Sequence, residues 1–166
     1  MTNLRLDYGV HYSDALAFVE SDDIAKQFMA KYKDRTREEY IRAFSLFFNW
    51  LKMRKGITLS PKEMLNKQLR FSKSNDIQER RWAANLAIEF CRDNPDLKGL
   101  SDTHANLHWN VIDQFFKHYE VPFCSARNPL GTKAGRRKHN PKGISREQAK
   151  KILTPSASEK KPLHYA

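Results

Sequence analysis

Residues 36–56 read TREEYIRAFSLFFNWLKMRKG, and this stretch decides the fold class. Thr36 and Glu39 have the spacing of a capping box, in which two side chains bind free backbone N–H groups at the start of a helix. Apolar residues then recur every three or four positions, at Tyr40, Phe44, Phe47 and Leu51. Such a repeat lies on one face of a helix, and Gly56 is typical of the residue that ends one. The stretch therefore predicts a long helix with a buried aromatic face.

The rest of the chain repeats this helical pattern, and no alternating run of β-branched residues predicts a strand. Further helices are expected from Ser21 or Asp22 to Tyr32, from Ser60 to Leu69, from Ile77 to Arg92 and from Leu100 to Tyr119. The third of these five helices begins with a second capping box, Ser60 to Glu63, that has proline at the first helical position. A short last helix is expected to begin at Ser145. The predicted fold class is all-α, a small helical bundle.

Composition divides the chain into four segments. Residues 1–20 are expected to form an irregular N-terminal arm, and residues 21–123 the helical domain. Residues 124–143 have the glycines and prolines of an extended linker, and residues 144–166 hold the last short helix and a tail. No acidic residue occurs between Val121 and Ser145, so the linker is strongly basic.

The net charge of +11 over 166 residues predicts attraction to polyanions, with nucleic acid first. Clustered Lys and Arg in the linker can contact phosphates and release counterions; a solvated linker without a partner is the alternative. Cys91 and Cys124 are isolated, as is usual in a reducing compartment. Because the sequence contains no signal peptide and no run of membrane-spanning length, we expect a cytoplasmic, nucleoid-associated protein without a membrane partner.

Catalytic and metal-binding patterns are weak. His104 and His108 lie one helical turn apart, but the pair lacks a third ligand and the Glu of the H-E-x-x-H pattern. Tyr40 and Tyr119 lie on apolar stripes and Tyr165 lies in the tail, so none has the surrounding cations that a phosphoryl-transfer nucleophile requires. We therefore expect no metal, no cofactor, no small-molecule substrate and no catalysis by this chain.

Two of the expected helices resemble the core-binding domain of tyrosine recombinases of the phage-integrase type. The family pattern T-x-x-x-Y-x-x-x-L-x-x-F-x-x-W-L is matched, with Phe for Leu, by Thr36, Tyr40, Phe44, Phe47, Trp50 and Leu51. In the later helix, GLSDTH at residues 99–104 and the pair Phe115–Phe116 fit the family's G-L-S-P-x-T start and aromatic end. Asp102 replaces the proline, His104 the usual Thr and Asp113 a frequent Arg. Residues 128–130 and 144–153 continue the likeness in the same order.

The resemblance implies a SAM-like bundle that clamps duplex DNA together with a catalytic domain. In such clamps the two helices approach the major groove and the linker follows the backbone, and self-association on DNA is a further expectation. Arg and Lys suit phosphates or guanine, whereas Asn suits adenine. The DNA-binding residues expected on this basis are Arg35, Arg37, Arg42, His104, Asn106, Asn110, Lys117, Arg127, Lys133, Arg136, Arg137 and Lys138.

The predicted function is therefore sequence-selective binding of double-stranded DNA, as the part of a site-specific recombinase that recognises its core site. The family's catalytic arginines, H-x-x-R motif and tyrosine would lie in a domain beginning near Ile144, and the sequence ends at Ala166 before the first of them. The alternatives are a stand-alone helical DNA-binding protein of a mobile element, a metal-dependent nuclease using His104 and His108, and a module whose basic linker binds an acidic protein.

Overall fold

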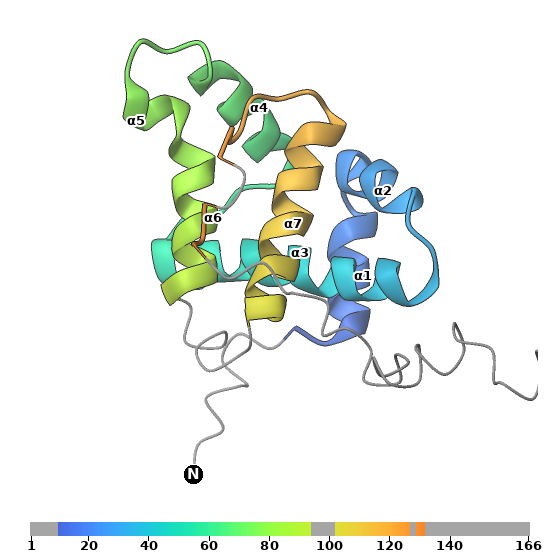
Figure 1. Cartoon of the computed structure of the whole chain (residues 1–166). Helices are drawn as coiled ribbons and strands as arrows, with labels where there is room; N and C mark the ends of the chain where they lie inside the picture. The colour runs from blue at the N-terminus through green and yellow to red at the C-terminus, as the bar shows by residue number, and fades with distance from the viewer. Residues whose placement is uncertain (1–9, 94–101, 127–128, 132–166) are drawn as a thin grey trace, which may run out of the picture. The chain divides into compact units, whose positions relative to one another are not determined.

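The computed structural model describes residues 10–93, 102–126 and 129–131, and these ranges contain helices and no strand. The all-α prediction is confirmed for them. The helices in chain order are α1 (Tyr12–Glu20), α2 (Asp23–Ala30), α3 (Asp34–Lys55), α4 (Pro61–Phe71), α5 (Ile77–Arg80), α6 (Trp82–Asp93) and α7 (Asp102–His118). In Figure 1, α3 runs across the bundle, while α6 and α7 lie side by side.

The long helix predicted from residues 36–56 is α3, although it begins earlier than expected. Its N-cap is Lys33, whose side chain makes no cap hydrogen bond, so the predicted capping box of Thr36 and Glu39 is wrong. The Glu39 carboxylate instead accepts a hydrogen bond from Arg35, one turn earlier. The end of the helix is as predicted, because Gly56 has φ +63° in the left-handed region that glycine adopts without strain.

Helix α1 corrects the prediction of an irregular arm for residues 12–20, while residues 1–9 of that arm lie outside the described residues. Ala15 and Val19 are buried one turn apart, and the half-buried Phe18 ring lies 5.3 Å from the ring of Phe48 on α3. The helix is short and its N-cap, His11, makes no side-chain cap bond, so the sequence carries no start signal. Its stability comes from packing on α3, as is usual for a helix of nine residues.

The predicted capping box of α4 is confirmed, and α2 begins next to the expected residue Asp22. Ser60 and Glu63 form the complete capping box at the start of α4. Asp22 caps α2 by accepting from the Ala25 N–H, and its second oxygen accepts from the Lys62 N–H on α4. The Asp22 side chain therefore joins the starts of two helices, which a sequence-based capping argument does not predict.

The single helix expected from Ile77 to Arg92 is divided at Arg81 into α5 and α6. The cause is Gln68 of α4, which is fully buried. Its amide nitrogen donates to the carbonyls of Arg80 and Pro122, and its amide oxygen accepts from the Ala83 N–H. A side-chain amide thus takes up backbone groups at the junction, which is a recognised cause of helix breaks. Leu69, the last residue of the predicted helix, lies within α4 and is 40% exposed.

Aromatic rings from four helices form the centre of the core. The Phe115 ring of α7 lies 5.4 Å from Phe28 of α2 and 4.9 Å from Phe44 of α3, and Phe47 of α3 lies 5.2 Å from Phe90 of α6. These rings are at most 1% exposed. The core therefore fixes α7 against α3, which positions the candidate site.

The other segment predictions lie outside the described residues, including the helix at Ser145, most of the basic linker and the tail. The two segment boundaries predicted beyond α1, after residues 123 and 143, stay predictions. Within the described residues, none of the helices has the length and apolar character that a membrane span requires.

Candidate nucleic-acid interface

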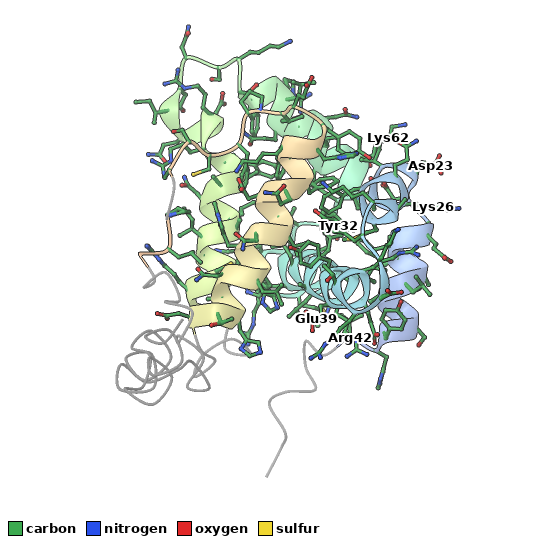
Figure 2. The ribbon with its side chains drawn as sticks, turned by 45° about the vertical axis from the view of Figure 1, so that its right-hand side comes forward. Asp23, Lys26, Tyr32, Glu39, Arg42 and Lys62 are labelled. Atoms are coloured by element: carbon green, nitrogen blue, oxygen red, sulfur yellow. The ribbon has the colours of Figure 1, made fainter. Side chains whose placement is uncertain are left out.

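A groove of about 560 Å³ lies between the first halves of α3 and α7. Its floor is apolar and its edges carry polar side chains. The lining residues are Val10, Glu39, Arg42, Ala43, Leu46, Thr103, His104, Leu107 and His108. The structure thus brings together two residues predicted to bind DNA, Arg42 and His104, from helices more than 60 positions apart. Figure 2 shows Glu39 and Arg42 next to one another at the surface.

The arginines of α3 do not form one cationic face. Arg35 and Arg42 are exposed and lie seven residues apart, which places them on the same side of the helix. Arg37 is half-buried on another side, and its Nε atom is buried without a hydrogen-bond partner. Of the three predicted arginines, two therefore belong to the surface at the groove.

Each of these two arginines is paired with a glutamate one turn away. Arg35 Nε lies 3.0 Å from Glu39 Oε1, and Arg42 Nη2 lies 2.9 Å from Glu38 Oε1. The Arg42 guanidinium also covers the Tyr12 ring at 5.3 Å. Exposed pairs of this spacing contribute only about 0.3–0.5 kcal/mol, so a phosphate can replace the carboxylate at low cost.

The residues of α7 that were predicted to bind DNA differ in how exposed they are and in whether they already have a partner. Asn110 is exposed, and within the described residues its amide makes no hydrogen bond. Asn106 is half-buried and already interacts with other groups. Lys117 Nζ lies 2.6 Å from the carboxylate of Asp113, which is 8% exposed. Asn110 is therefore the side chain best placed to read a base edge.

The two histidines have separate environments. His108 is buried beside Phe90, and its Nδ1 lies 2.7 Å from the His104 carbonyl oxygen. Desolvation lowers the pKa of His108, although the bond to the carbonyl opposes this shift. His104 is exposed at the groove and takes part in further interactions. Among the residues that the structure describes, no three His, Cys, Asp or Glu side chains are placed to hold a metal ion.

The tyrosines considered as nucleophiles lie at the edge of the core. Tyr40 is half-buried with its ring 4.6 Å from that of Tyr32, and burial raises its pKa. The Tyr119 hydroxyl donates to the Ile24 carbonyl at 2.5 Å, and burial raises its pKa as well. Both environments favour the neutral phenol. Tyr165 lies outside the described residues.

Sequence reasoning missed the partners that complete this surface. Val10 and Tyr12 reach it from the N-terminal segment that was expected to be irregular. Glu38 and Glu39 neutralise the arginines, and the i, i+4 spacing of both pairs was a signal for this contact. The predicted linker residues Arg127, Lys133, Arg136, Arg137 and Lys138 lie outside the described part of the chain.

The comparisons with known proteins identify no relative of the chain. Neither a family model, nor a curated protein, nor a solved structure matches it.

Proposed function

We propose that this chain binds double-stranded DNA in a sequence-selective manner through the face that α3 and α7 share. The observation that carries the proposal is the groove with Arg42 and His104 on its walls and the uncommitted amide of Asn110 on the adjoining surface of α7. Arg reads guanine or contacts phosphate, and Asn pairs bidentately with adenine. The net charge of +11 supplies attraction to DNA that does not depend on sequence.

Duplex DNA is favoured over single strands because of where the aromatic rings lie. Proteins that bind single strands present aromatic side chains on which bases stack. The large apolar residues exposed in the described part of the chain are Met53, Leu69 and Ile77, and none is aromatic. The Phe, Tyr and Trp rings in that part of the chain are buried or half-buried, and the half-buried rings of Tyr12, Phe71 and Trp82 are covered by Arg or Lys side chains.

The role follows from the resemblance noted in the sequence. We propose that the bundle is a SAM-like core-binding domain, which recognises the core site of a tyrosine recombinase without catalysing cleavage itself. The apolar stripes of α3 and α7 that carry the resemblance pack against one another, and Arg42 and His104 line the groove beside this contact. Phosphate contacts would position the protein, and the groove would read the sequence.

The test compares Asn110→Ala with Gln27→Ala, which removes an exposed amide from α2. Binding is measured by fluorescence anisotropy on duplexes selected from a random pool. We expect Asn110→Ala to weaken binding to the selected duplex by about 1–3 kcal/mol, the worth of a bidentate base contact, and to leave random duplex unaffected. Gln27→Ala should change neither. An equal loss on both duplexes would contradict base reading by Asn110.

A further inference from the structure

A second charged surface lies where α4 leads into α5. Lys67, Arg70, Lys73, Arg80 and Arg81 belong to it, and we call it the α4–α5 corner. Within the described residues, none of these five cations forms an ion pair. Arg35 and Arg42, the two arginines at the groove, are both paired. The corner is therefore the more strongly cationic of the two surfaces.

The carboxylates near the corner do not cancel its charge. Residues 64–75 contain no acidic residue, and residues 64–82 hold five basic residues and two acidic ones, a net charge of +3. One of the two acids, Asp76, is used as the cap of α5, where it accepts from the Gln78 N–H. Glu79 is the other acidic residue of this range, and two carboxylates cannot balance five cations.

The corner is also held in a fixed shape. Lys67 Nζ lies 4.7 Å from the centre of the Trp82 ring and 5.5 Å from that of Phe71, and the Arg70 guanidinium lies 6.0 Å from Phe71. The buried Gln68 amide ties α4 to the α5–α6 junction. Cations that are already ordered lose less entropy when they bind a ligand.

We infer that the α4–α5 corner binds the phosphate backbone of a second segment of duplex DNA, an inference that rests on the proposed function. Figure 1 shows α5 near the end of the bundle where α7 finishes, whereas the groove lies where α7 begins. The 17 residues of α7 extend about 25 Å at 1.5 Å per residue. Figure 1 shows that α3 runs across α7, so a duplex that follows Arg35 and Arg42 of α3 crosses the start of α7 at an angle and, being stiff on this scale, does not bend along α7 to the corner.

The exposed chemistry of the corner fits phosphate better than an acidic protein. Its surface is dominated by cations and amides, with Leu69 and Ile77 as isolated exposed apolar side chains. Protein interfaces instead have an apolar core from which charged residues are depleted. Interfaces with DNA are more polar and far more positive.

The test is capture of a second duplex. A biotinylated 30-bp duplex on beads is loaded with the full chain and washed, and a fluorescent 30-bp duplex is then added. The corner variant carries Arg70→Gln, Lys73→Gln and Arg81→Gln, three exposed side chains. The control carries Lys26→Gln, Lys52→Gln and Lys62→Gln, which removes the same charge from exposed sites elsewhere (Lys26 and Lys62 in Figure 2). A poly-glutamate peptide is titrated in parallel.

We expect the corner variant to capture at least fivefold less second duplex than the wild type, and the control to change by less than twofold. Equal losses in the two variants, or capture unchanged in the corner variant, would overturn the inference. Loss of poly-glutamate binding with duplex capture intact would also overturn it and assign the corner to an acidic protein. Wild-type protein that retains the first duplex but captures no second contradicts this inference alone. Failure to retain even the first contradicts the proposed function as well.

Discussion

Replacing Gln68 with Met tests whether buried hydrogen bonds hold the α4–α5 corner together. Met has nearly the same length and shape as Gln but cannot make the three hydrogen bonds of the amide, to Arg80, Pro122 and Ala83. Each such bond contributes about 1 kcal/mol net, and each backbone group left unpaired in the interior adds a desolvation cost. We therefore expect the free energy of unfolding to fall by at least about 3 kcal/mol, which lowers the Tm by roughly 10 °C or more in a domain of this size.

Urea denaturation followed by circular dichroism measures this loss, and hydrogen exchange adds a local readout. The Ala83 amide should exchange faster in the variant, because its acceptor is the Gln68 side chain. Gln78→Met, on the exposed surface of α5, is the matched control and should change stability by less than about 0.5 kcal/mol. A loss below about 1 kcal/mol in Gln68→Met, with the protection of Ala83 unchanged, would refute the reasoning.

Three further predictions concern α2, the core and the linker. Asp22→Ala should cost about 2 kcal/mol in urea denaturation, because the carboxylate accepts from both Ala25 and Lys62; Asp23→Ala, at an exposed neighbour, should cost far less. Burial lowers the pKa of His108 in the folded protein. As the pH falls, the His108 side chain is therefore protonated in the unfolded chain before it is protonated in the folded one. Stability should be full above pH 6.5 and fall as the pH drops below it, and His108→Gln should flatten that fall. Replacing Arg136, Arg137 and Lys138 together with Gln should weaken binding to all duplexes and flatten its salt dependence; an unchanged salt slope would rule the linker out as a phosphate contact.

The fold was predictable where the determinants are local in sequence. The capping box of Ser60 and Glu63, the stop at Gly56 and the aromatic stripe of α3 all depend on residues within a few positions of one another. Predictions failed where a distant contact decides. Helix α1 forms because α3 covers it, and the break at Arg81 requires Gln68, whose polar side chain does not suggest a buried position.

In the candidate site, too, the features that depend on local sequence were predictable and those that depend on helix packing were not. Helical periodicity correctly placed Asn110 and Lys117 on an exposed face of α7. It could not show that Arg42 and His104 share a groove, since this depends on how α3 packs against α7. Nor did the charge count reveal which cations are neutralised, because pairing depends on side-chain geometry. The net charge of +11 can be counted from the sequence, but the positions of the unpaired cations on the surface depend on the fold.

The proposed DNA binding is tested by measuring how the full chain binds a random-sequence 30-bp duplex, with fluorescence anisotropy at salt concentrations from 50 to 200 mM. We expect saturable binding at 50 mM salt with an affinity that falls steeply as salt increases, because phosphate contacts release counterions. We also expect repeated selection from the random pool to enrich a defined sequence. No binding of duplex DNA at 50 mM salt would contradict DNA binding by this chain.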